Sequence, residues 1–160
     1  MRRLSVPLLA LLLTLSLGAQ AALAASPHFI GDPMISKSTT SGLTVTWKAA
    51  GLGNLPSDAF LTATSVEAQY TCVNKGGNVA PGQPLVFEDV TGPTTTIPPS
   101  NGQITFTVTL PPPPTPSSAD VCPNGNWSVR LDSLTYFGVV VHIQQNGVDI
   151  LTGDLGTIDP

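Results

Sequence analysis

Charged side chains are scarce in this 160-residue sequence, in which only 10% of the residues are Asp, Glu, Lys or Arg. Two of the six basic residues, Arg2 and Arg3, lie in an N-terminal segment that we expect to be removed. The rest of the chain then has four basic and ten acidic residues, a formal charge of −6. Because four scattered cations cannot neutralise a phosphate backbone, we expect no nucleic-acid binding.

Residues that catalysis and metal binding require are also few. The chain has two histidines, His28 and His142, and two cysteines, and their positions give no zinc-ligand spacing. The G-x-S-x-G motif of serine hydrolases is missing. The acidic residues that could pair as in a glycosidase, such as Glu88 and Asp89, show no distinguishing pattern. We therefore predict no catalytic residue, no metal site, no cofactor and no enzymatic activity.

Long apolar runs are confined to the N-terminus. A basic start, an apolar stretch from Val6 to Leu17 and the small residues before position 25 are typical of a secretory signal peptide. We predict a signal peptide at residues 1–24, with cleavage after Ala24 or, as the alternative, after Ala21. Residues 25–160 are then one exported domain, and no stretch in them approaches the roughly 20 apolar residues that span a bilayer.

Export to an oxidising compartment gives the two cysteines an obvious role. We expect an intramolecular disulfide between Cys72 and Cys122. A free thiol and an intermolecular bridge are the alternatives, but neither cysteine has a basic neighbour in sequence that would activate it.

Apolar residues alternate with polar ones along most of the chain. The alternation predicts strands in residues 35–38, 43–48, 62–72, 85–89, 94–97, 103–110, 127–132, 135–144 and 148–152. Asn146-Gly147 predicts a tight hairpin turn between the last two. Eight or nine strands without a helix longer than one turn indicate an all-β fold, an antiparallel two-sheet β-sandwich of immunoglobulin-like type.

The same alternation assigns side chains to faces. Trp47 and Trp127 align with core residues, whereas Tyr136 and Phe87 are expected to be more exposed. Tyr136, Val140 and His142 are predicted to share an outer face, which makes them a candidate binding surface; the loop containing Asn74 and Asn78 is another. The apolar run 139–141 raises the further hypothesis of a homodimer through this face.

The proline-rich segment 111–118 cannot donate hydrogen bonds to a sheet. We interpret it as a stiff extended surface connection rather than as a ligand for an aromatic groove.

Two stretches together resemble a family. Lys48–Gly53 fits K-x-A-G-L-G, and Cys72–Gly82 fits C-x-N-x-G-G-N-x-x-P-G, a pairing similar to small secreted actinobacterial-type proteins of unknown function. The resemblance covers about a quarter of the exported part. It implies export, a disulfide and a β-rich domain, and it transfers no catalytic residue.

The sequence thus favours a secreted, non-catalytic β-sandwich that serves as an extracellular or cell-envelope binding or structural module. Its expected partner is an extracellular protein or a glycan. The alternatives are a diffusible secreted effector, such as a hydrolase inhibitor, and, less favoured, a glycan-directed enzyme that uses an acid pair.

Overall fold

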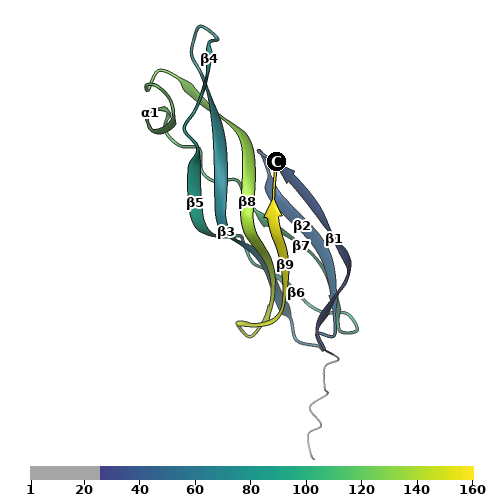
Figure 1. Ribbon diagram of the computed structural model, residues 1–160. Helices are drawn as coiled ribbons and strands as arrows, with labels where there is room; N and C mark the ends of the chain where they lie inside the picture. The colour runs from purple at the N-terminus through teal and green to yellow at the C-terminus, as the bar shows by residue number, and fades with distance from the viewer. Residues whose placement is uncertain (1–25) are drawn as a thin grey trace, which may run out of the picture.

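The computed structural model describes residues 26–160, which form β-structure almost throughout (Figure 1). The predicted signal peptide, residues 1–24, lies outside the described residues. The elements in chain order are β1 (His28–Ser38), β2 (Gly42–Ala50), β3 (Ser57–Val73), β4 (Val79–Pro81), β5 (Leu85–Thr91), β6 (Thr95–Ile97), β7 (Gln103–Leu110), α1 (Ser118–Val121), β8 (Ser128–Gln145) and β9 (Val148–Ile158).

The strands form two antiparallel sheets. One sheet has three strands in the order β1-β2-β7, and the other has six. In the larger sheet β8 lies between β3 and β9, while the short strands β4, β5 and β6 share the second edge of β3. The prediction of a mostly β fold with two antiparallel sheets is confirmed. The segments predicted at 127–132 and 135–144 are one continuous strand, β8.

The core lies between the sheets. Leu43 and Val108 of the small sheet and Leu61, Tyr136 and Val141 of the large one are at most 2% exposed. Burial of such apolar surface, at about 25 cal/mol per Å², is the main force that holds the two sheets together.

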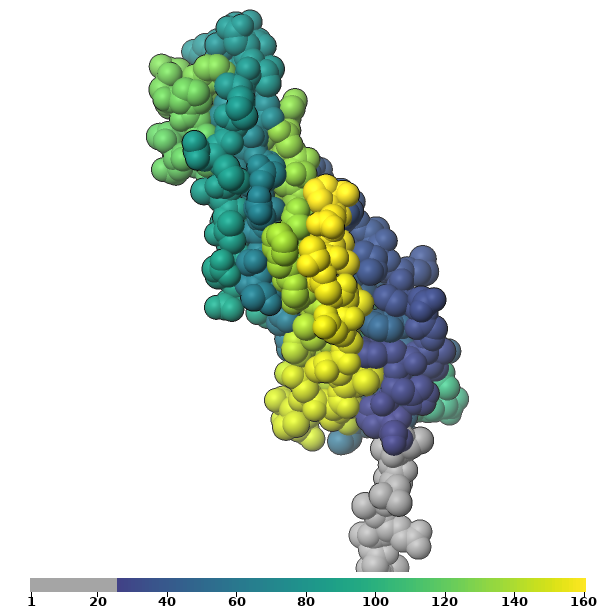
Figure 2. Space-filling view, viewed as in Figure 1, coloured from purple at the N-terminus to yellow at the C-terminus, as the bar shows by residue number. Residues whose placement is uncertain are grey.

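The sheets also meet along one side, where β9 runs next to β1 (Figure 2). Trp47 of β2 stacks on Phe29 of β1 with ring centroids 3.9 Å apart, and its indole N–H donates to the Gly31 carbonyl at 2.8 Å. A Cβ atom at Gly153 of β9 would lie under 3.0 Å from both rings. This position therefore requires glycine, and Trp47 packs against the core as predicted.

β3 and β8 continue past the small sheet into an end that carries β4 and α1 (Figure 1). There the predicted disulfide is present: Cys72 of β3 is bonded to Cys122 directly after α1. Val121 is buried beside it, and its carbonyl accepts a hydrogen bond from the Gln83 backbone at 2.8 Å. The disulfide thus attaches the connection between β7 and β8 to the end of the large sheet.

Two other local predictions have opposite outcomes. Asn146 and Gly147 both have positive φ, 53° and 76°, as the predicted hairpin turn requires. The core assignment of Trp127 is wrong, because this residue is half-buried and lies outside the core cluster. It precedes β8 at the protruding end, where the small sheet does not reach.

The proline-rich connection, residues 111–117, belongs to no helix or strand, in agreement with a surface connection. Pro111–Pro114, together with Val66, Phe87 and Val90, line an apolar groove of about 200 Å³. Phe87 is half-buried against the core there, like Trp47, and does not show the greater exposure that was expected of it.

The alternation of inward and outward side chains shifts by one residue at the same level of β3 and β8 in the large sheet. We call this shift the phase change. On β3 the inward residues are Leu61 and Ala63 before it and Val66 after it, a step of three where alternation requires two. On β8 the same step separates Tyr136 from Val139. Since both strands shift at the same level, their pairing register is the same on either side of the step.

Residues with positive φ lie at the level of the phase change on the neighbouring strands. Thr64 of β3 lies between Gly138 of β8 and Asp89 of β5, and both of these have positive φ, 57° and 51°. Gly156 of β9, the register partner of Val139, also has positive φ, 68°. Because a one-residue shift exchanges the two faces of a strand, this line decides which side chains enter the core.

We expect loss of the disulfide to lower the melting temperature by about 10 °C or more. Opening a 50-residue loop removes on the order of 4 kcal/mol of stability in the chain-entropy model. The check compares thermal melts of the oxidised protein, the reduced protein and the Cys72→Ala/Cys122→Ala double variant. Superimposable melts would contradict the expectation.

Gly138→Ala should lower the free energy of unfolding by about 2–4 kcal/mol, because φ is positive and the new Cβ would meet Thr64 Oγ1 at 2.3 Å. Gly147→Ala is the matched control: it has positive φ but open space around the Cβ, so it should cost only about 1 kcal/mol. Urea unfolding measures both. Adding Thr64→Ala should restore part of the loss in the Gly138 variant, and no recovery would argue against a clash at this level.

Candidate functional site

A hydrogen-bonded chain of three side chains lies on the outer face of the large sheet. His142 of β8 is central: its Nε2 is 3.0 Å from Thr62 Oγ1 of β3, and its Nδ1 is 3.1 Å from Asp149 Oδ2 of β9. An ionised carboxylate only accepts hydrogen bonds, so Nδ1–H donates to Asp149 and the Thr62 hydroxyl donates to Nε2. Three strands therefore fix one tautomer of the neutral imidazole.

Phe60 stacks on the imidazole ring of His142. It is the register partner of His142, and the two rings are stacked with centroids 4.8 Å apart and planes 5° from parallel. The His142 side chain is 19% exposed, so it is held on three sides and still reaches solvent. Such a ring is pre-organised, because its rotamer is set before any ligand arrives.

A shallow depression of about 330 Å³ opens next to His142, at the level of the phase change. Besides His142, its lining combines three hydroxyls, one carboxylate and the apolar residues Ala63, Val90 and Val140; the polar ones are Thr62, Thr64, Thr91 and Asp89. Asp89 lies opposite Thr64, where the register pairing of β5 with β3 skips one position and Asp89 has positive φ. We name this depression, together with His142, the outer-face site.

The order hydroxyl, imidazole, carboxylate is that of a nucleophilic triad, with Thr62 in the position of the nucleophile. Acyl transfer also requires hydrogen-bond donors, from backbone N–H groups or side chains, that stabilise an oxyanion. Thr62 pairs with Val140 on one side and Thr91 on the other, whereas both ladders skip Thr64 two residues along the strand. The geometry therefore provides a hydrogen-bonded chain in triad order and assigns no oxyanion donors.

The structure brings together only part of the predicted binding surface. Val140 and His142 both belong to the outer-face site. The placement of Tyr136 beside them is wrong: it is fully buried, because the three-residue step before Val139 turns it into the core. Phe137 takes the outward position in its place and is 36% exposed.

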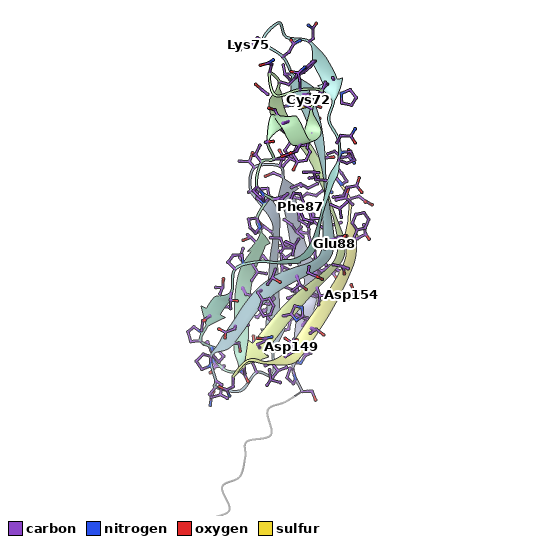
Figure 3. All side chains as sticks on the ribbon, turned by 90° about the vertical axis from the view of Figure 1, so that its left-hand side faces the viewer. Cys72, Lys75, Phe87, Glu88, Asp149 and Asp154 are labelled. Atoms are coloured by element: carbon purple, nitrogen blue, oxygen red, sulfur yellow. A yellow bond between two sulfur atoms is a disulfide. The ribbon has the colours of Figure 1, made fainter. Side chains whose placement is uncertain are left out.

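The other predicted surface lies at the opposite end of the molecule. Figure 3 places Lys75, in the turn between β3 and β4, far from Asp149. Asn74 Oδ1 accepts hydrogen bonds from the backbone N–H groups of Gly76 and Asn78, each at 2.9 Å. Asn74 therefore shapes this turn, and neither it nor Asn78 contributes to the outer-face site.

The hypothesis of a homodimer rested on the apolar run 139–141, and the structure gives this run another explanation. Val139 and Val141 are fully buried between the sheets, so the apolar run 139–141 is explained by the core, and Val140 alone of the three faces outward.

Sequence reasoning missed Thr62, Phe60 and Asp149 as partners of His142. Thr62 is 80 residues away, and only the pairing of β3 with β8 brings it close. Asp149 had a usable signal, since the Asn146-Gly147 hairpin folds β9 back along β8 within seven residues of His142.

Within residues 26–160, no group of three or more His, Cys, Asp or Glu side chains is arranged to hold a metal ion. No helix in this range is long and apolar enough to cross a membrane.

Comparisons with known proteins add little. No protein-family model matches the sequence, and the search of curated proteins found no match. Among solved structures, the chain is distantly similar to the crystal structure of Spo0M, a sporulation control protein from Bacillus subtilis, with 19% identity and a TM-score of 0.27. The match covers 84% of this chain and 49% of Spo0M. The resemblance to small secreted actinobacterial-type proteins stays a prediction.

The hydrogen-bond geometry predicts that neutral His142 carries its proton on Nδ1, although isolated neutral imidazole favours Nε2–H. Nitrogen-15 chemical shifts of the labelled ring identify the tautomer above pH 8. Asp149→Ala should move the population toward Nε2–H, because the acceptor for Nδ1–H is lost. Dominance of Nε2–H in the unmodified protein would contradict the assigned hydrogen bonds.

Proposed function

We propose that this protein is a secreted, non-catalytic binding module of the extracellular space or cell envelope, and that its outer-face site binds an uncharged glycan. The signal-peptide pattern of residues 1–24 and the disulfide support export. We also propose an immunoglobulin-like arrangement, supported by two antiparallel sheets packed across a common core.

The observation that carries this proposal is the composition of the outer-face site. Three threonine hydroxyls, the Asp89 carboxylate and the imidazole of His142 surround an open depression next to the aliphatic side chain of Val140. Sugars present hydroxyl groups, which need both donors and acceptors, and C–H faces, which pack on apolar side chains. A shallow, pre-formed depression suits a chain that lies along the sheet rather than a molecule that must be enclosed.

The negative charge of the exported part favours a neutral glycan over an anionic one. The exported part has a formal charge of −6, and Asp89 and Asp149 place two of the carboxylates at or next to the site. An anionic polymer would be repelled by this field, whereas a neutral polysaccharide would not.

A hydrolase is the second candidate, because Thr62, His142 and Asp149 stand in triad order. The triad order is the one observation in its favour, because no oxyanion donors are assigned beside Thr62. Turnover of an activated ester that is abolished by Thr62→Val and retained in Glu67→Gln would establish this activity in place of simple binding.

His142→Phe removes the hydrogen-bonding atoms of the imidazole, and Asp89→Asn replaces one carboxylate acceptor by an amide donor and removes the charge; each keeps size and local backbone preference and should weaken glycan binding about tenfold. The measurement is depletion of the protein from solution by insoluble glucan, chitin and purified peptidoglycan, followed by titration with soluble oligosaccharides of the bound polymer.

Glu67→Gln is the matched control, because Glu67 lies on the same strand, β3, beyond the phase change and outside the depression. It should bind as the unmodified protein does. Equal binding by all four proteins, or no depletion by any polymer, would contradict the proposal.

A further inference from the structure

The sequence has three Asn-Gly pairs, at residues 101–102, 124–125 and 146–147. In such a pair the backbone nitrogen of the glycine can attack the side-chain carbon Cγ of the asparagine and displace its amide group. Glycine favours this attack, because it has no Cβ that would hinder the nitrogen. The reaction still requires the two atoms to approach each other in the right orientation. The backbone conformation at each pair therefore decides whether that pair reacts.

Two of the pairs form hairpin turns that keep these atoms apart. Asn101 and Asn146 have positive φ, 51° and 53°, and each is the first residue of a two-residue turn, closed by the pairing of Ser100 with Gln103 and of Gln145 with Val148. In this left-handed conformation ψ is about +30 to +60°, which points the nitrogen of the next residue away from the Asn side chain. The glycine nitrogen reaches Cγ in these pairs only if the hairpin opens.

Asn124 has a different conformation. It is exposed in the segment between the disulfide and β8, and its φ is not positive. Its Oδ1 accepts a hydrogen bond from the backbone N–H of Asn126 at 3.0 Å. This Asx turn folds the side chain back over its own backbone, and the Gly125 nitrogen lies inside the loop that the hydrogen bond closes. The bond therefore keeps Cγ of Asn124 close to the atom that attacks it.

The surroundings of Asn124 also favour the attack. Negative charge develops on Oδ1 as the Gly125 nitrogen adds to Cγ, and the Asn126 N–H already donates to this oxygen. The Ser118 hydroxyl donates to the Gly125 carbonyl at 3.2 Å, which helps to position the attacking peptide group. A Cβ at Gly125 would meet no atom within 4 Å, so there is room for the new ring.

We propose that Asn124 is a site of spontaneous deamidation. The Gly125 nitrogen forms a bond to Cγ of Asn124, the bond from Cγ to Nδ2 breaks, and Nδ2 leaves as ammonia with the proton of the Gly125 N–H. Water then opens the resulting succinimide at either carbonyl, which gives aspartate or isoaspartate at position 124. Each product adds one negative charge, and isoaspartate also adds one carbon atom to the backbone.

The modified segment lies at the protruding end. Figure 3 shows Cys72, whose disulfide partner Cys122 directly precedes the segment, far from Asp149. Deamidation therefore adds charge to the exported protein as it ages and leaves the outer-face site unchanged. The proposal does not depend on the glycan function of that site.

The experiment incubates the exported protein, disulfide intact, in mildly alkaline buffer made with oxygen-18 water. Peptide mapping by mass spectrometry then gives the rate of deamidation at each Asn-Gly pair, and the heavy oxygen marks the products formed during the incubation. We expect Asn124 to react at least about tenfold faster than Asn101 and Asn146, because only its Cγ is held near the glycine nitrogen. In the reduced protein unfolded in guanidinium chloride, the three rates should become similar.

Gly125→Ala should slow the reaction of Asn124 at least about fivefold, because the added methyl group hinders the attacking nitrogen. The open space at this position means that the variant should keep its fold, which a thermal melt verifies. Gly147→Ala is the matched control and should leave the rate at Asn124 unchanged. Equal rates at the three pairs in the folded protein, a faster rate at Asn101 or Asn146, or an unmodified Asn124 after the unfolded protein has reacted would overturn the proposal.

Discussion

The structure depends on the phase change that crosses the large sheet at Thr64 and Gly138. In a strand the two faces alternate strictly, so a one-residue shift exchanges core and solvent for every later side chain. Both β3 and β8 make this shift at the same level, which keeps their pairing and preserves one continuous core. The same line directs Tyr136 inward and Phe137 outward, and it opens the depression beside His142.

Most of the fold could be predicted from the sequence because most strands obey simple alternation. The phase change could not, since residues 62–72 and 135–144 each read as uniform period-two strands when they are considered alone. Gly138 was the available signal, because a glycine inside a strand often marks a bulge. Read that way, it would have placed Tyr136 in the core. The core assignment of Trp127 was wrong for another reason: alternation along a strand does not say where the opposing sheet ends.

The candidate site was predictable only in part. His142 and Val140 share an outer face that alternation identifies after Gly138, so they were found from sequence. The ring partners Thr62 and Phe60 lie on β3, and no pattern in the sequence specifies that β3 pairs with β8. Asp89 was equally hidden, because its position depends on β5 pairing with the other edge of β3. The site depends on the order of the strands in the sheet, and the periodicity of the sequence gives no information on that order.

The central claim is that the protein is exported and then held by a glycan through the outer-face site. The most direct test expresses the full-length gene in a bacterial host of actinobacterial type and measures how the exported protein divides between washed cells and clarified medium. The account predicts that the unmodified protein stays with the cells until the wall is digested, and that the His142→Phe/Asp89→Asn double variant passes into the medium. Recovery of both proteins entirely in the medium, or equal retention of both, would contradict it.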